Sequence, residues 1–156
     1  MRSIASVFIL GIILVLGSCR ADFETVASTG DLKFSKDTVY LDTVFTNIGS
    51  STYQLKVYNK SKNDINIPII QFEKGLNSKY RMTVDGQQGT AGKIFKDITL
   101  LAKDSLYIFI ETTASIADAN PTDFLYTDKI QFDSGANLQT VELVTLILDA
   151  FFFFFY

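Results

Sequence analysis

The amino-acid sequence predicts an all-β fold, a two-sheet β-sandwich of seven to eight strands. Between Leu32 and Asp149, short apolar segments alternate with Gly, Asn, Asp and Ser, the residues that favour turns. The apolar residues show no sustained 3.6-residue period, and several segments instead repeat every two residues, as half-buried strands do. Strands at this spacing over about 120 residues are typical of a sandwich.

The first two predicted strands flank a turn. Thr38 to Thr46 (TVYLDTVFT) is rich in β-branched and aromatic residues, and the turn residues Asn47 to Ser51 follow it. In the second strand, Thr52 to Asn59 (TYQLKVYN), alternation predicts a buried face and a solvent face. The buried face consists of Tyr53, Leu55 and Val57, and the solvent face consists of Gln54, Lys56 and Tyr58.

The middle of the chain continues with the same period. Ile65, Ile67 and Ile69 repeat every two residues, but Pro68 lacks the N–H that a sheet ladder needs, which predicts an edge strand or a bulge. The strands that follow are predicted to direct two apolar sets inward: Tyr80, Met82 and Val84, and then Leu106, Ile108 and Ile110. The outward residues between them are Lys79, Arg81, Thr83, Tyr107, Phe109 and Glu111.

The last predicted hairpin is the most apolar. Ile130 and Phe132 precede a turn at Asp133 to Gly135, and Gln139 to Leu148 forms the final strand. That strand is apolar on both faces, as strands covered on both sides are, because its second face carries Val144, Leu146 and Leu148. The sequence FFFFFY then has nothing left in the chain to cover it, so we interpret residues 150–156 as a truncation or frameshift remnant. The alternative is a final strand that completes the sandwich and carries an apolar tail.

The first nineteen residues have the anatomy of a signal peptide. Arg2 supplies a positive start, Ile4 to Leu16 is an apolar run too short for a permanent membrane helix, and Gly17-Ser18 are small residues. Cys19, the only cysteine in the chain, follows directly. An ordinary secretory signal needs no cysteine at this position.

The segment Leu16-Gly17-Ser18-Cys19 resembles the bacterial lipobox, in which the thiol is diacylated and a peptidase then cuts before the cysteine. The resemblance implies a signal peptide helix over residues 1–18, lipid attachment at Cys19 and a tether over residues 19–30. Each buried methylene contributes about 0.8 kcal/mol, so two or more acyl chains make release from a membrane very slow. The alternative is an ordinary signal or a membrane-anchor helix in which Cys19 is merely a small buried residue.

The composition excludes several classes of function. The formal charge of −3 and a pI near 4.8 provide no basic stripe for a nucleic acid. The chain has no histidine, which removes the usual catalytic triad and the commonest nitrogen ligand of transition metals. We therefore expect no enzyme activity, no catalytic, metal or cofactor-binding residues, no cofactor and no nucleic-acid partner.

Three local patterns suggest chemistry, and each has a simpler interpretation. Gly86 to Lys93 (GQQGTAGK) superficially resembles a phosphate loop. However, Gln87 stands where that motif needs glycine and Ile94 where it needs a hydroxyl residue, which favours a hairpin loop. The oxygen ligands in DANPTD, namely Asp118, Asn120 and Asp123, depart from the calcium-loop spacing and suit a strand connection. Asn59-Lys60-Ser61 matches an N-glycosylation acceptor, which we interpret as a coincidence.

Two tyrosines on the predicted solvent faces suggest a binding surface. Tyr58 and Tyr107 are outward residues and could serve a sugar or a protein partner. Sandwich faces also carry tyrosine without any ligand. The sequence leaves both interpretations open.

The order of the segments resembles the immunoglobulin-like modules of the hydin and abnormal-spindle type. The resemblance lies in FTNIGSSTYQLKVYNKSKNDINI, ITLLAKDSLYIFIETT and YTDKIQFDSGANLQTVELVTLI. It implies an immunoglobulin-like (Ig-like) sandwich over residues 31–149. Together with the lipobox, DTVYLDTVFTNIGSSTYQLKVYN is similar to uncharacterised lipoproteins of flavobacteria, in the Bacteroidetes, where a longer carboxy-terminal region follows such a module.

These observations predict a lipid-anchored cell-envelope protein with a non-catalytic Ig-like spacer or interaction module. We expect it to be an outer-membrane lipoprotein, periplasmic or surface-exposed, whose partners are the membrane and an unidentified protein or glycan. The first alternative is a polysaccharide-binding surface lipoprotein of a nutrient-uptake system. The second is the N-terminal fragment of a larger envelope protein or enzyme.

Overall fold

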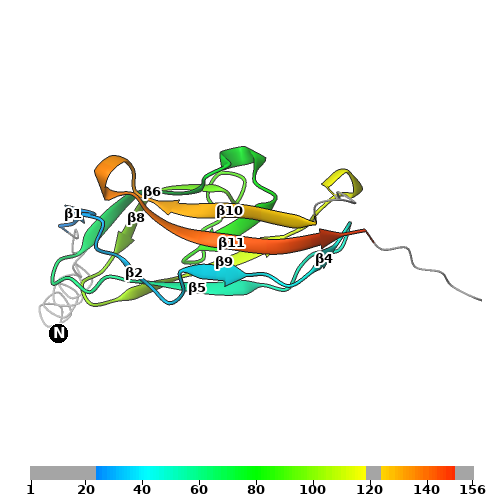
Figure 1. Cartoon of the computed structure of the whole chain (residues 1–156). Helices are drawn as coiled ribbons and strands as arrows, with labels where there is room; N and C mark the ends of the chain where they lie inside the picture. Colours follow the sequence, from blue (N-terminus) through cyan, green and yellow to red (C-terminus); the bar gives the residue numbers. More distant parts are fainter. Residues whose placement is uncertain (1–23, 119–123, 150–156) are drawn as a thin grey trace, which may run out of the picture.

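The computed structural model describes residues 24–118 and 124–149. The predicted signal peptide, the lipobox with Cys19 and the aromatic segment at 150–156 lie outside the described residues. Within them the chain folds as an all-β sandwich of two sheets, which confirms the predicted fold class (Figure 1). The strands outnumber the seven to eight predicted, because short strands of two or three residues join the long ones.

The first sheet has four antiparallel strands in the order β2-β5-β9-β7. Its central strands are β5 (Tyr53–Tyr58) and β9 (Ser105–Thr112), and its edges are β2 (Lys33–Phe34) and β7 (Tyr80–Val84). The predicted alternation of β5, β7 and β9 is confirmed, apart from a half-buried Tyr53 at the start of β5, because their other inward residues are all buried.

The second sheet has seven strands. Its main path runs β1-β6-β10-β11-β3, while β8 pairs with β6 and β4 pairs with β11. The long strands β6 (Ile65–Phe72), β8 (Ile94–Leu100), β10 (Leu125–Phe132) and β11 (Gln139–Leu148) pair antiparallel. The short strands β1 (Val26–Ala27), β3 (Thr38–Tyr40) and β4 (Val44–Phe45) add parallel pairs.

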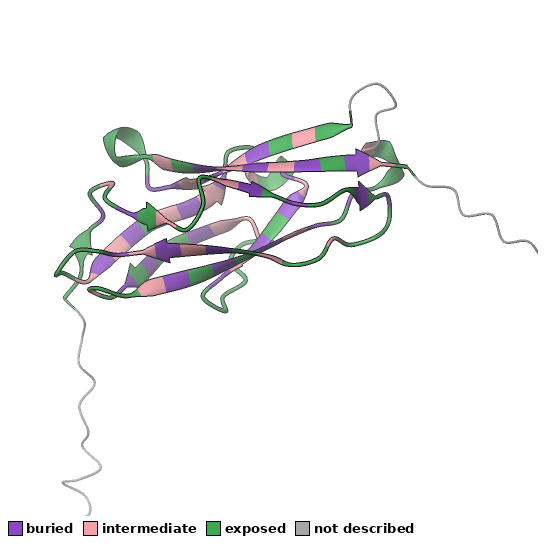
Figure 2. Ribbon diagram, turned by 60° about the horizontal axis from the view of Figure 1, so that its bottom comes forward, coloured by how far each residue is buried: buried purple, intermediate pink, exposed green. Residues whose placement is uncertain are grey.

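The hydrophobic core lies between the two sheets. Figure 2 shows buried residues alternating with exposed or half-buried ones along the long strands, which is the two-residue period expected of a sandwich. Aromatic rings bridge the layers, since Phe34 of β2 lies 4.8 Å from Phe132 of β10, centroid to centroid. With each buried Leu, Ile or Phe side chain contributing about 1.5–3 kcal/mol, burial between the sheets stabilises the fold without a disulfide.

Pro68 lies where β6 changes the face that it turns inward. Ile65 and Ile67 are buried before it, but Ile70 and Phe72 are buried after it, so Ile69 is only half-buried, contrary to prediction. The ladder keeps one register past Pro68, so no residue is inserted as in a bulge. β6 is an interior strand, not an edge strand. It tolerates the proline because the ladders with β1 and β10 leave a gap there.

One predicted strand differs in its bounds, and one strand was not predicted, each for a local reason. The segment Thr38 to Thr46 forms two strands, because the Tyr53 hydroxyl accepts a hydrogen bond from the Asp42 N–H at 3.0 Å and donates one to its carboxylate at 2.7 Å. Strand β8 has no clean alternation in the sequence, since Asp97 interrupts it with a left-handed backbone (φ 53°).

The described chain starts and leaves at opposite ends of the sandwich (Figure 1). Near the start of β11, the Asn137 side chain donates to the Ser28 carbonyl at 3.2 Å. Near its end, the Thr46 N–H donates to the Leu148 carbonyl at 3.0 Å. Because β11 has ten residues, the two ends are about 30 Å apart. The sheet begins at Val26, before the predicted domain boundary at residue 31, since β1 pairs with β6.

The outer face of β11 differs from expectation. The sequence predicts cover on both faces, yet Leu146 is 42% exposed and Val144 only half-buried within the described residues. Tyr40, which pairs with Val144 on the same face, is 70% exposed. This face carries apolar side chains beside the end of the described chain.

Candidate functional site

The outer face of the four-stranded sheet carries aromatic, cationic and hydroxyl side chains on neighbouring strands. In register, Lys56 of β5 lies opposite Tyr107 of β9, and Gln54 lies opposite Phe109. On the other side of β9, Thr83 of β7 lies opposite Phe109. We call Tyr58, Tyr107, Phe109 and Lys56 the aromatic face.

The aromatic face presents ring surfaces to solvent. Tyr107 and Phe109 are 38% and 40% exposed, and their rings are nearly parallel, with centroids 6.4 Å apart and an interplanar angle of 18°. The Lys56 ammonium lies 4.9 Å from the centroid of Tyr107 and 5.2 Å from that of Tyr58. Tyr58, predicted to be exposed, is half-buried, and the Lys60 ammonium also lies 4.7 Å from its centroid.

Lys56 keeps its positive charge throughout the neutral range. Its pKa is raised above the ordinary value, chiefly by a hydrogen-bonding interaction with the Tyr107 side chain. No carboxylate in the described residues lies within 4.0 Å of its ammonium. The lysine is therefore a cation that lies over aromatic rings, interacts with the Tyr107 side chain and, at longer range, with Asp104, and forms no ion pair within the described residues.

A hollow of about 430 Å³, which we call the β5 hollow, lies beside the aromatic face. Its lining residues are Ser35, Lys36, Thr52, Tyr53, Gln54, Lys56, Tyr58 and Tyr107. Two of these described residues are lysines, none is acidic, and most of the others carry a hydroxyl. The volume lies within the range of ligand pockets, and the lining combines cations, hydroxyls and rings.

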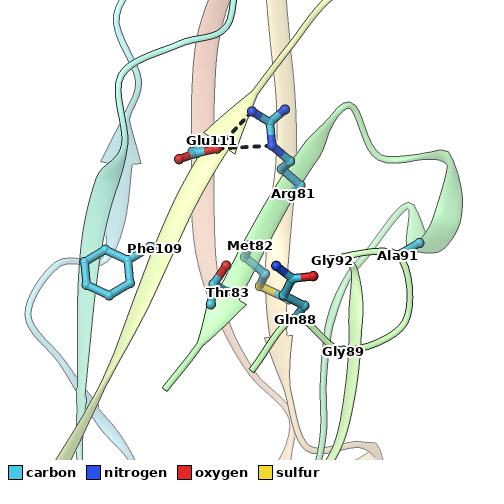
Figure 3. Close-up of a pocket in the computed structure, with 9 residues that line it drawn as sticks. All are labelled: Arg81, Met82, Thr83, Gln88, Gly89, Ala91, Gly92, Phe109 and Glu111. Atoms are coloured by element: carbon cyan, nitrogen blue, oxygen red, sulfur yellow. Dashed lines mark hydrogen bonds and ion pairs between the residues drawn. The ribbon is translucent and has the colours of Figure 1, made fainter. Parts of the chain in front are cut away.

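A second hollow of about 400 Å³, the β7 hollow, lies on the other side of β9. Figure 3 shows it between β7 and the loop that carries Gln88 and Gly92, with the Phe109 ring on the far side of β9 from Thr83. The loop needs glycine at position 89, where φ is 55° and a Cβ would come within 2.5 Å of the Ile94 carbonyl oxygen. The Gly92 carbonyl accepts from the Met82 N–H at 2.8 Å, which fixes the loop against β7.

The charged groups of the β7 hollow satisfy one another. Arg81 donates to Glu111 Oε2 through Nε and Nη2 at 3.1 and 2.9 Å, and through Nη1 to Thr113 at 2.8 Å. The pKa of Glu111 is lowered, first by the hydrogen bond from Thr52; partial burial opposes this, and Arg81 adds to it. This network orders the sheet face and leaves less free charge than the β5 hollow does.

The segments that resemble a phosphate loop, a calcium loop and an N-glycosylation acceptor make contacts within the protein. Lys93, at the end of the phosphate-like segment, donates to the carbonyls of Leu76 and Ser78 at 2.7 and 2.5 Å. Asp118 pairs with Lys79 at 3.1 Å, whereas Asn120 and Asp123 lie outside the described residues. Asn59 is 3% exposed, and its amide donates to the carbonyls of Asn63, Leu100 and Leu101, so it holds a loop and is not open to a glycan.

Sequence reasoning found two members of the aromatic face and missed two. The sequence predicts Tyr58 and Tyr107 as exposed aromatics, whereas it assigns Phe109 and Lys56 only to solvent faces. The signal for Phe109 was present, because residues two apart on a strand share a face. The pairing of Lys56 with Tyr107 needs the β5–β9 register, which one strand alone does not reveal.

Across residues 24–118 and 124–149, no group of three or more His, Cys, Asp or Glu side chains is placed to hold a metal ion. No helix in the part of the chain that the structure describes is long and apolar enough to cross a membrane.

No protein-family model matches the chain, and no curated protein matches it. Solved structures do show a likeness in fold. The chain is similar to the ASH / PapD-like domain 7 of human CEP192, with 11% identity over 86% of this chain and 96% of that one and a TM-score of 0.46. It is also similar to the E. coli chaperone DraB, with 16% identity over 78% of this chain and a TM-score of 0.48.

A third likeness is to a family 123 glycoside hydrolase from Clostridium perfringens, with 10% identity over 77% of this chain and a TM-score of 0.50. The chain spans 57% of the DraB chain and 27% of the hydrolase chain. At these identities the comparisons concern the fold alone. The two-sheet sandwich rests on the strand pairing itself, while the Ig-like module of the hydin and abnormal-spindle type and the flavobacterial lipoproteins stay predictions.

Proposed function

We propose that the mature protein is anchored in the cell envelope by lipid on Cys19 and carries a non-catalytic Ig-like spacer or interaction module. The observation that supports a spacer is the position of the two ends. The described chain starts at one end of the sandwich and leaves at the other, about 30 Å away along β11 (Figure 1). A module of this shape separates whatever precedes it from whatever follows it.

The distance from the anchor supports the same proposal. The chain from Cys19 to Val26, where β1 begins, spans at most about 25 Å when fully extended. An acylated Cys19 therefore holds the β1 end of the sandwich close to the lipid surface.

Replacing the acylated sulfur tests the anchor. The full-length protein is expected to incorporate a palmitate label and to sediment with the outer membrane, whereas Cys19→Ser takes up no label and leaves that fraction. Tyr107→Ala serves as the control, since it alters an exposed side chain and is expected to stay anchored. A Cys19→Ser protein that is still processed and still sediments with the envelope would contradict the proposal.

A second candidate function is polysaccharide binding by an envelope-anchored protein. The aromatic face favours it, because exposed and nearly parallel Tyr107 and Phe109 rings lie beside a hollow lined with hydroxyls and lysines. A glycan array probed with the full-length protein in detergent separates the two functions. A spacer without a ligand binds no glycan, and a binder retains a defined class.

A further inference from the structure

We propose that the aromatic face and the β5 hollow bind an acidic polysaccharide, one whose sugar units carry carboxylates. The proposal rests on the second candidate function, polysaccharide binding, and names its ligand class. Tyr107 and Phe109 receive the sugar rings, and Lys56 and Lys36 receive the carboxylate.

The rings provide the apolar part of the site. A sugar ring has a face of C–H groups, and packing that face on an aromatic ring removes apolar surface from water. Tyr107 and Phe109 are both about two-fifths exposed and nearly parallel, so one chain of sugar units can contact both. Tyr58 continues the aromatic surface on the neighbouring strand, at the edge of the β5 hollow.

The lysines select for negative charge. Lys36 and Lys56 both line the β5 hollow, whose lining includes no acidic residue, although the whole chain carries a formal charge of −3. A carboxylate near these ammonium groups forms a charge-assisted hydrogen bond, which is stronger than a bond between neutral groups. The Gln54 amide lies in the same hollow and suits the hydroxyl groups of a sugar, whereas the Thr52 hydroxyl there already donates to Glu111 and the Ser35 hydroxyl accepts from the Lys56 N–H at 3.0 Å.

The edges of this sheet argue against an acidic peptide as the ligand. An extended peptide usually binds by adding a strand to an open sheet edge. At the β7 edge, the N–H groups of Met82 and Val84 already donate to the Gly92 and Gln87 carbonyls at 2.8 and 3.0 Å. The opposite edge, β2, has only two residues. The open surface is the face of the sheet, where rings and ammonium groups point outward.

The test measures binding of the full-length lipidated protein in detergent to polygalacturonate by affinity electrophoresis. Fully methyl-esterified polygalacturonate serves as the neutral counterpart, and poly-glutamate as an acidic peptide. We expect retardation by polygalacturonate, with affinity at least tenfold lower for the ester, for Tyr107→Ala and for Lys56→Gln. Controls on the other sheet are Tyr40→Ala and Lys129→Gln, which are expected to bind as the wild type does.

The outcomes separate the proposals. If polygalacturonate and its methyl ester both bind, and binding depends on Tyr107 but not on Lys56, the acidic ligand is overturned. Polysaccharide binding then stands. Equal binding of poly-glutamate overturns a polysaccharide as the ligand, and an equal loss in Tyr40→Ala overturns the assigned site. No binding to any polysaccharide on a glycan array overturns both binding proposals and leaves the spacer. Unchanged thermal unfolding of Tyr107→Ala and Lys56→Gln, expected for surface residues, shows that a loss of binding is not a loss of fold.

Discussion

Two tyrosines in this molecule each lie under two lysine ammonium groups, and they differ in what else holds those lysines. At Tyr126, the ammonium groups of Lys74 and Lys79 lie 4.2 and 4.8 Å from the ring centroid. At Tyr58, those of Lys56 and Lys60 lie 5.2 and 4.7 Å away. The ring contacts alone do not distinguish the two places.

The contacts around Tyr126 form a closed network. Lys79 pairs with Asp118 at 3.1 Å, Lys74 donates to the Thr127 carbonyl, and the Lys79 N–H donates to the Tyr126 hydroxyl at 3.0 Å. Beneath it, the fully buried Tyr80 packs 5.2 Å from the Tyr126 ring and donates to the Tyr126 carbonyl at 3.1 Å. Burial raises the pKa of Tyr80 far above its ordinary range, so the hydroxyl stays neutral.

The contacts around Tyr58 leave charge available. Neither Lys56 nor Lys60 has a carboxylate within 4.0 Å in the described residues. The same pair of residue types is therefore a structural support in one place and an open surface in the other. A lysine over an aromatic ring indicates a ligand site only when the protons of its ammonium group are not already used.

The largest expected difference between the two regions is in stability. Tyr80→Ala removes a fully buried ring and should lower the free energy of unfolding by about 3–5 kcal/mol. Tyr107→Ala removes an exposed ring and should change it by less than about 1 kcal/mol. Urea denaturation of both variants measures the difference. Similar losses would mean that the aromatic face is part of the core.

Removing single hydroxyls sharpens the comparison. Tyr126→Phe loses the acceptor of the Lys79 N–H and should destabilise the fold by about 1 kcal/mol. Tyr58→Phe should leave stability unchanged, since its hydroxyl makes no hydrogen bond among the described residues. The midpoints of urea unfolding report both effects, provided that the free energy of unfolding falls with urea concentration at the same slope in all variants. A loss at Tyr58 equal to that at Tyr126 would contradict the distinction between closed and open contacts.

The sequence predicts the two faces of a strand better than it predicts which strands are neighbours. Alternation placed nearly all the inward residues of β5, β7 and β9, and the bounds of β11, correctly, because burial on one face imposes the two-residue period. It failed at Ile69, where Pro68 shifts the inward face, and it did not reveal β8, whose alternation Asp97 interrupts. The candidate site depends on the β5–β9 register, a tertiary property that only hydrogen bonding between distant segments determines.

The smallest expected effect concerns the ion pair of the closed network. Partial burial by itself would raise the pKa of Asp118, but the Ser115 N–H and hydroxyl and the Lys79 ammonium lower it more, so the net pKa lies below the ordinary value. A lowered pKa in the folded state contributes stability above the unfolded pKa, and that stability is lost as pH falls through the folded pKa. Asp118→Asn should therefore lower stability at pH 7 by less than about 1 kcal/mol, and the difference from wild type should shrink below about pH 4. Urea denaturation at several pH values measures it.

Lys56→Gln is the control, because the raised pKa of Lys56 keeps it charged across this range and no acid pairs with it in the described residues. If the Asp118→Asn difference stayed constant down to pH 2, the carboxylate would not be acting through its charge.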